Sequence, residues 1–332
     1  MPNKVVTLGE VLMRLSTPSH KRFSQTDQFT LDFGGAEANV AVSLAQWGIA
    51  TTHVTALPEN DLGKAAISFL REHNVNTDQI YFAPGRMGLY FFENGTMQRS
   101  SRIIYDRFDS VFSDFSGDEI DWGQVFDGAD CFHWTGITPA LSANAAKLTL
   151  TALQAASQKG LLISGDINYR RNLWNYGKNP LDIMPELISY TNVIVAGITD
   201  LNNCLGIEEE SDYEKACAHA LSNNSSIKLI TSTERNSISA SHNQLKGMLY
   251  DGRNMHISKS YDITHIVDRI GGGDAYIAGL LYGLLNFTKI EALEFATAAS
   301  VLKHSISGDV NLASLEEVEA LVRGENVGKL LR

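Results

Sequence analysis

Short apolar runs alternate with amphipathic segments along most of this 332-residue chain. The apolar runs predict buried strands at residues 5–8, 52–57, 131–134, 161–167, 193–196 and 228–231. Apolar residues that recur every three or four positions predict helices at residues 36–47, 63–73 and 143–159. Strands alternating with helices of this length are typical of a mostly parallel sheet covered by helices on both faces.

Two stretches, 12–31 and 89–105, interrupt this rhythm because polar and apolar residues nearly alternate there without a helix. The second contains Asn94-Gly95, which favours a tight hairpin turn since both residues tolerate positive φ. We expect these strands to leave the main sheet and form a small lid. The sequence therefore predicts one three-layer α/β/α domain over residues 1–332, with a lid formed by inserted segments at about 11–32 and 88–108.

The charge and cysteine content narrow the classes of partner. With 27 basic and 38 acidic residues the formal net charge is -11, which disfavours nucleic-acid and anionic membrane partners. The most apolar stretch, 275–288, is shorter than the roughly 20 residues that a membrane span needs. The three scattered cysteines suggest buried thiols in a reducing compartment rather than a disulfide framework or zinc site. A cytoplasmic location is expected.

A run of three glycines, Gly271, Gly272 and Gly273, stands before Asp274 and an apolar pattern with helical spacing. Backbone N–H groups at such a helix start can converge on an anion and suit a phosphate. A carboxylate in the same turn can accept a proton from an attacking hydroxyl. A flexible loop with an aspartate that caps the helix is the alternative.

A second glycine pair, Gly34 and Gly35, opens the first long helical pattern, and Asn39 follows it. Small residues there permit close approach of a ligand or a neighbouring strand. The amide of Asn39 can donate and accept hydrogen bonds with vicinal hydroxyls, or it can be an exposed polar residue in a first helical turn.

The ordered pair Gly-Gly-x-x-x-Asn and Gly-x-Gly-Asp resembles the two signatures of the ribokinase-like (PfkB) carbohydrate kinases, and the resemblance covers essentially the whole chain. It implies the ribokinase-like fold. It also implies that Asp274 is the catalytic base, that Gly271, Gly272 and Gly273 form the anion hole, and that ATP with Mg²⁺ is the donor. No protein side chain is expected as a metal ligand, and a requirement for a monovalent cation is left open.

Further stretches resemble the branch of this family that phosphorylates 2-keto-3-deoxygluconate: Gly88-Leu89-Tyr90, Tyr105-Asp106-Arg107, residues 136–141, Asp166-Ile167-Asn168-Tyr169-Arg170 and the turn from Asp268 to Asp274. Guanidinium groups suit the carboxylate of such a sugar acid, whereas either arginine alone could be a surface charge. The resemblance implies substrate contacts by Gly34, Gly35, Asn39, Tyr90, Tyr105, Arg107, Arg170, Asp274 and Asp309. It implies nucleotide contacts by Asn168, Thr231, Thr233, Asn236, Gly271 and Gly273.

The chain departs from the family pattern where magnesium and nucleotide are handled. An Asn-x-x-Glu motif is replaced by residues 197–200, in which Asp200 is a shorter acid, and the expected nucleotide-contacting loop at 231–237 has no glycine. A fructokinase or other ketose kinase, and a catalytically weak sugar- or nucleotide-binding protein, are the alternatives. We expect a homo-oligomer, at least a dimer through the lid, because a small isolated sheet needs its edge covered.

Overall fold

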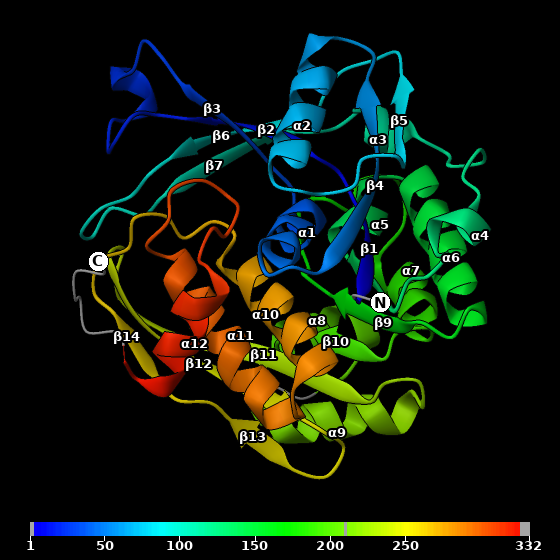
Figure 1. Cartoon of the computed structure of the whole chain (residues 1–332), viewed down its shortest axis with the longest axis vertical. Coiled ribbons are helices and arrows are strands. Elements are labelled where there is room, and N and C mark those ends of the chain that lie inside the picture. Colours follow the sequence, from blue (N-terminus) through cyan, green and yellow to red (C-terminus); the bar gives the residue numbers. More distant parts are fainter. Residues whose placement is uncertain (1–2, 209–210, 326–332) are drawn as a thin grey trace.

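The computed structural model of the chain describes residues 3–208 and 211–325. The expected domain span of 1–332 also includes 1–2, 209–210 and 326–332, which lie outside the described residues. Figure 1 shows a large sheet between two groups of helices, with a second, smaller sheet at its upper left. This is the expected three-layer α/β/α architecture.

The main sheet has ten strands in the order β13-β12-β11-β10-β9-β8-β1-β4-β5, with β14 paired to β12. Neighbours from β11 to β5 run parallel, whereas β12 is antiparallel to β11, β13 and β14. The strands are β1 (Lys4–Leu8), β4 (Ala50–Pro58), β5 (Ile80–Ala83), β8 (Cys131–Thr135), β9 (Leu162–Asp166), β10 (Val193–Val195), β11 (Leu229–Ser239), β12 (His242–Tyr250), β13 (Met255–Ile257) and β14 (Tyr261–Ile263).

Helices cover both faces of this sheet (Figure 1). They are α1 (Ala36–Gln46), α2 (Asp61–Glu72), α3 (Val111–Asp114), α4 (Trp122–Val125), α5 (Ile137–Leu141), α6 (Ala143–Gln158), α7 (Pro180–Ile188), α8 (Ile198–Leu205), α9 (Tyr213–Asn223), α10 (Gly272–Asn286), α11 (Lys289–Lys303) and α12 (Leu315–Arg323). A short 3₁₀ helix spans Phe23–Gln25. None of the helices in the described ranges is both long and apolar enough to cross a bilayer.

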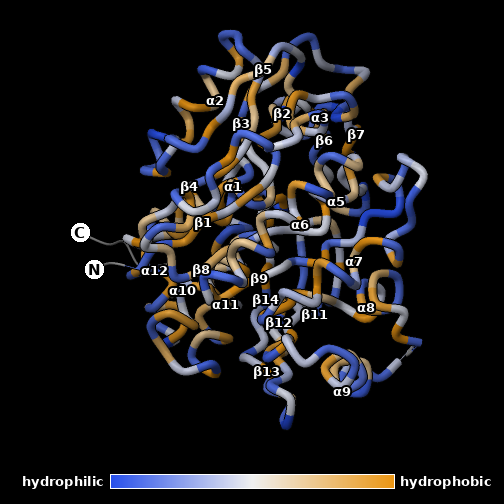
Figure 2. The backbone as a smooth tube through the Cα atoms, turned by 90° about the vertical axis from the view of Figure 1, so that its right-hand side faces the viewer, coloured by the Kyte–Doolittle hydropathy of each residue, from blue (hydrophilic) through white to orange (hydrophobic). Residues whose placement is uncertain are grey.

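Adjacent residues of each buried strand serve different hydrophobic clusters because side chains alternate across a sheet. In β1, Val5 packs in the cluster that includes α1, α10 and α11, whereas Val6 packs in the cluster of α6, α7 and α8. Both side chains are fully buried. Figure 2 shows the apolar segments gathered in the interior layers and hydrophilic ones in the outer connections. Burial on both faces explains why these strands read as continuous apolar runs.

The smaller sheet has the order β3-β2-β6-β7 and is built from β2 (Leu12–Ser16), β3 (Thr30–Gly34), β6 (Leu89–Glu93) and β7 (Arg102–Asp106). We call it the small sheet. The expected hairpin between β6 and β7 is present, but the expected tight turn at Asn94-Gly95 is wrong. Residues 94–101 connect the strands, with an isolated bridge between Thr96 and Arg99. The Arg99 guanidinium pairs with Glu93, and the Asn94 side chain donates to the carbonyl of Val267, so tertiary contacts shape this connection.

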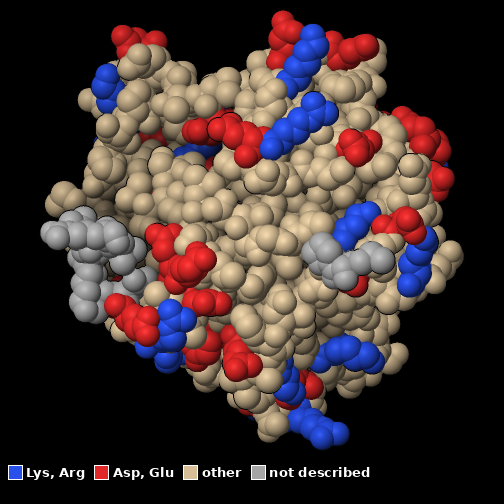
Figure 3. Space-filling model, in the orientation of Figure 1, with Lys and Arg blue, Asp and Glu red and all other residues tan. Residues whose placement is uncertain are grey.

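Charged side chains are dispersed over the face of the molecule in Figure 3, where basic and acidic groups are interspersed and no continuous basic area is visible. The cysteines are Cys131, Cys204 and Cys217, and all three are buried free thiols, as the sequence predicts.

Candidate active site

A cavity of about 390 Å³ lies where the small sheet meets the carboxyl ends of the main-sheet strands and the start of α10. We call it the turn cavity. Ligands of open α/β sheets usually bind at this edge. The predicted site residues that line it are Gly35, Asn39, Tyr90, Tyr105, Arg107, Asn168, Arg170, Gly271, Gly273, Asp274 and Asp309. The tertiary structure therefore brings together most of the predicted residues from separate parts of the chain.

The glycine turn has a shape that side chains would not permit. Gly271 has a φ of 79°, in the left-handed region, and a Cβ there would overlap the carbonyl oxygen of Asp309. A Cβ on Gly272 would meet the ring of His304 at 2.9 Å. At Gly273, by contrast, a Cβ would meet no protein atom within 4 Å. The turn is thus packed behind Gly271 and open at Gly273, where the backbone faces the cavity.

Asp274, in the first turn of α10, is held by the other glycine signature. The Asn39 Nδ2 donates a 2.7 Å hydrogen bond to the Asp274 Oδ2. Burial raises the pKa of Asp274 from 3.8 to about 7; the Asn39 bond lowers it, and the carboxylates of Asp309 and Glu37 raise it. A carboxyl with this pKa can exchange a proton near neutral pH, as a general base requires.

Two further carboxyl groups lie near Asp274, and the sequence did not predict a role for either of them. Glu37 is buried and accepts hydrogen bonds from the hydroxyls of Thr135 and Thr138. Asp166, at the end of β9, lines the turn cavity. Burial, followed by the charges of Asp200 and Asp274, raises the pKa of Asp166 well above its ordinary value. The position of Asp166 at a strand's carboxyl end was the available sequence signal.

Asp309 lies in the cavity wall and is bound by the small sheet. The Tyr90 hydroxyl donates to its carboxylate at 2.6 Å, and the Arg14 guanidinium pairs with it at 2.6 Å. The same guanidinium pairs with Asp268 at 2.6 Å. Gly34 is required beside them because a Cβ there would overlap the Asp309 carboxylate. Arg14 was missed, since nothing in its local sequence indicates these partners.

Arg107 also lines the turn cavity, but its guanidinium already has a partner inside the protein. Its Nε and Nη2 donate to Glu10 Oε2 at 2.9 and 2.6 Å, and both side chains are buried. Ser110 donates to the other oxygen of Glu10. Arg107 is therefore oriented by Glu10. Arg170, which also lines the cavity and follows strand β9, is exposed and has no ion pair within the described part of the chain.

Only some of the residues that were predicted to contact the nucleotide lie at the turn cavity. Asn168 lines the turn cavity, whereas Thr231, Thr233 and Asn236 do not. The expected loop at 231–237 is wrong, because these residues continue strand β11 and pair with β12. The backbone N–H and C=O groups of residues 231–237 form hydrogen bonds with β12, so the stretch is extended and contains no turn.

The side chain of Thr231 is not available to a nucleotide in this structure. It is fully buried, and its hydroxyl is shared with the Tyr276 hydroxyl and the carbonyl of Met248. Asp200, the shorter acid, accepts from the backbone N–H groups of Gly197 and Tyr169. Asp200 therefore acts as a helix cap and a loop anchor.

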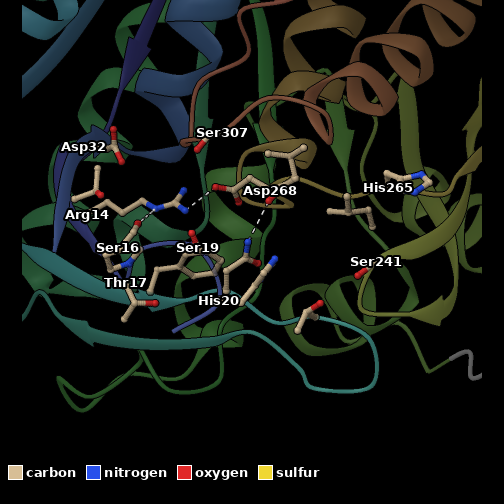
Figure 4. Close-up of a pocket in the computed structure, with 17 residues that line it drawn as sticks. Arg14, Ser16, Thr17, Ser19, His20, Asp32, Ser241, His265, Asp268 and Ser307 are labelled. Carbon is tan, nitrogen blue, oxygen red and sulfur yellow. Dashed lines mark hydrogen bonds and ion pairs between the residues drawn. The ribbon is translucent and has the colours of Figure 1, made fainter. Parts of the chain in front are cut away.

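A larger cavity of about 630 Å³ lies on the other side of the Arg14 ion pairs (Figure 4). We call it the outer cavity. Figure 4 shows Arg14 and Asp268 pointing toward each other at its inner wall. Its lining contains neither Asp274 nor the glycine turn. The volume of a cavity therefore does not identify the candidate active site. The smaller turn cavity is the one that contains Asp274 and the glycine turn.

Oxygen ligands for a metal are sparse around the turn. No group of three or more His, Cys, Asp or Glu side chains within residues 3–208 and 211–325 has a metal-binding arrangement. Of the three carboxylates that line the turn cavity, Asp274 is bound by Asn39 and Asp309 by Arg14 and Tyr90, which leaves Asp166 as the hard oxygen donor available to a metal. This donor set fits a Mg²⁺ ion that takes most of its ligands from phosphates and water.

Comparisons with known proteins agree on one family. The profile described as pfkB family carbohydrate kinase matches residues 2–314. The 2-dehydro-3-deoxygalactonokinase of Haloferax volcanii is 30% identical over 330 residues, which is 99% of each chain.

Solved structures of related proteins share the fold. The 2-dehydro-3-deoxygluconokinase of Thermotoga maritima superposes with a TM-score of 0.93 at 41% identity, covering 98% of this chain and 99% of that one. A PfkB family carbohydrate kinase from Listeria grayi has a TM-score of 0.91 at 37% identity, covering 97% of this chain and 100% of its own. The expected ribokinase-like fold is confirmed.

Proposed function

The chain belongs to the pfkB family of carbohydrate kinases, and from this membership we propose that it transfers the γ-phosphate of ATP to 2-keto-3-deoxygluconate. The acceptor is the primary hydroxyl, expected at O6. The observation that supports the catalytic part is the position of Asp274, which lines the turn cavity in the first turn of α10, beside the open glycine turn. Its bond to Asn39 and its pKa of about 7 suit a proton acceptor.

The proposed transfer is an in-line displacement. The sugar hydroxyl loses its proton to the Asp274 carboxylate as its oxygen attacks the γ-phosphorus, and the bond from phosphorus to the leaving oxygen of ADP breaks. The backbone N–H groups at Gly271, Gly272 and Gly273 stabilise the charge of the moving phosphoryl group. The small sheet acts as a lid that keeps water from replacing the sugar hydroxyl.

A sugar acid suits the cationic groups of the turn cavity. Arg107, oriented by Glu10, and Arg170, without an ion pair among the described residues, both line the cavity. Either can bind a carboxylate through parallel N–H groups. Tyr90 and Tyr105, whose ring centroids are 5.7 Å apart, complete the wall supplied by the small sheet.

The donor site is proposed at Asn168 and the glycine turn, with Thr233 and Asn236 as candidates farther along β11. When bound, Mg²⁺ would neutralise phosphate charge, and Asp166 is the side chain that would hold it.

The acceptor could instead be the galactonate epimer or a neutral ketose. The name of the Haloferax volcanii relative supports the epimer, and Arg107 and Arg170 favour an acid over a neutral sugar. The test is an ATP-consumption assay with 2-keto-3-deoxygluconate, its galactonate epimer, fructose and ribose. Turnover confined to the acids supports the proposal, and turnover with fructose alone contradicts it. Binding of an acid without any turnover would favour a sugar-binding protein.

We propose that the chain forms a dimer through the small sheet, because the face of this sheet that points away from the turn cavity carries a row of apolar side chains. Leu31, Leu15, Phe91 and Ile104 stand side by side across the four strands. Leu31 and Ile104 are 46% and 55% exposed. An apolar row of this length on a sheet is typical of an interface.

The three buried free thiols fit a reducing compartment, and we propose a cytoplasmic location.

A further inference from the structure

Four arginines line the turn cavity, and only one of them has an ion-pair partner among the described residues. Arg107 is bound by Glu10, while Arg170, Arg235 and Arg269 form no ion pair within the described ranges. An arginine beside a cavity that lacks a carboxylate partner can interact with an anionic ligand at full charge.

Two of these arginines, Arg235 and Arg269, lie close to each other. Arg235 comes from β11 and Arg269 from the segment just before the glycine turn. Partial burial in the cavity wall lowers the pKa of Arg235, and the neighbouring positive charge of Arg269 lowers it further. Two like charges held together cost free energy unless an anion lies between them. We call them the arginine pair.

One guanidinium is anchored and the other is unrestrained. The Nη2 of Arg269 donates to the carbonyl of Ala240 at 2.6 Å, which fixes the group beside β11. Its other N–H groups have no hydrogen-bond partner among the described residues. Arg235 has an exposed side chain. Both arginines line the same cavity as Gly271, Gly273 and Asp274, so the arginine pair shares the space in which the phosphoryl group would be transferred.

We propose that the arginine pair binds the polyphosphate chain of the nucleotide donor. This inference rests on the proposed kinase function and adds two residues that the sequence did not assign. A sugar acid carries one negative charge, whereas a triphosphate carries several along a short chain, and only the latter can neutralise two adjacent guanidinium groups. Arg269 is two residues before Gly271, so its charge acts on the same turn that stabilises the transferred group.

Binding to the full-length protein is measured by calorimetry without any sugar, using ATP and, separately, inorganic tripolyphosphate as probes. Arg235→Gln and Arg269→Gln should each weaken both affinities by about 10- to 100-fold, the range for a charge-assisted hydrogen bond. Arg253→Gln is the matched control, because Arg253 is exposed and lines neither cavity. It should change both affinities by less than about twofold.

Steady-state kinetics provide the second readout. The KM for ATP should rise in both variants while the KM for the sugar acid stays within about threefold. A rise confined to the sugar-acid KM, or unchanged affinities for both probes, would overturn the proposal. The Arg235 side chain has no hydrogen bond or ion pair with the residues that the structure describes, so Arg235→Gln tests the proposal even if Arg269→Gln disturbs the Ala240 segment. If no sugar acid is phosphorylated but polyphosphate affinity depends on the pair, the proposed function falls and this inference stands.

Discussion

Asn39 and Asp274 are 235 positions apart in the chain, yet the amide of one donates a 2.7 Å hydrogen bond to the carboxylate of the other. The bond joins the first turns of α1 and α10, and each turn follows one of the two glycine signatures. Two motifs that are weak evidence separately thus form one site. The amide also holds the Asp274 carboxylate in place and moderates the rise of its pKa.

Replacing the proposed base should abolish most of the activity. Asp274→Asn removes the proton acceptor while keeping the side chain's size, so kcat should fall by about 10²- to 10⁴-fold. The dissociation constant of the sugar should change little, because the contacts that bind it remain. Asp27→Asn, at an exposed position, is the control and should retain normal turnover. A nearly normal kcat for Asp274→Asn would remove this residue from its assigned role.

The pH profile should report the same carboxyl. The base must be ionised, and its pKa is about 7, so kcat/KM should rise with pH through about 7 and then level off. Asn39→Ala removes a hydrogen bond that lowers this pKa, and the midpoint should therefore move to higher pH. Profiles of both proteins, measured with saturating nucleotide, test this. A shift to lower pH would contradict the role of Asn39.

The same pKa has a consequence for stability. The folded state holds the Asp274 proton more tightly than the unfolded chain, whose ordinary pKa is 3.8. This contribution to stability is complete below pH 3.8 and is lost as the pH rises through about 7. Asp274→Asn should therefore gain stability relative to the parent protein as the pH rises from about 4 to about 7, and it should keep that gain at higher pH, as measured by denaturant unfolding. If the difference in unfolding free energy between Asp274→Asn and the parent protein were the same at pH 5 and pH 8, the raised pKa of Asp274 would be contradicted.

The two ends of the glycine turn should respond differently to a methyl group. In Gly271→Ala, the alanine would have to keep the left-handed φ of this position, and its Cβ would overlap the carbonyl oxygen of Asp309. The protein should therefore lose at least about 1–2 kcal/mol of stability. Gly273→Ala meets no protein atom and should keep its Tm, but its methyl group enters the cavity. Its kcat/KM should fall by about tenfold or more. Equal effects of the two substitutions on Tm would contradict this geometry.

Arg107 should discriminate sugar acids from neutral sugars. Arg107→Ala removes the guanidinium that is proposed to bind the carboxylate of the sugar acid. It also leaves Glu10 buried without its cation, so the protein should lose about 3–5 kcal/mol of stability. The decisive measurement is the ratio of kcat/KM for 2-keto-3-deoxygluconate to that for fructose within the same variant, which cancels the folding loss. The ratio should fall by about tenfold or more. An unchanged ratio would exclude Arg107 as the carboxylate ligand, and Glu10→Gln provides a comparison that keeps the arginine.

The outer face of the small sheet should hold a dimer together. A charge placed in its apolar row by Leu31→Lys or Ile104→Lys would have to be buried in the interface, so each variant should be monomeric in light scattering. Leu181→Lys, which alters an exposed leucine on α7, is the control. A parent protein that is itself monomeric at micromolar concentration would contradict the proposed dimer.

The alternating pattern of the chain determined much of the fold. Continuous apolar runs predicted the parallel strands because such strands are buried on both faces, and the glycine signatures identified α1 and α10 as the helices that begin at the site. The alternation in two other stretches indicated the small sheet. These features are local, so periodicity and residue type could reveal them.

Only the tertiary structure decided the partners of the charged groups. Arg14 pairs with Asp268 and Asp309, which are 254 and 295 positions away, and no local pattern encodes such contacts. The stretch 231–237 became a strand because β12 supplies its hydrogen-bond partners. The net charge of -11 describes the composition as a whole, whereas the arginines gathered at the turn cavity depend on how distant segments pack.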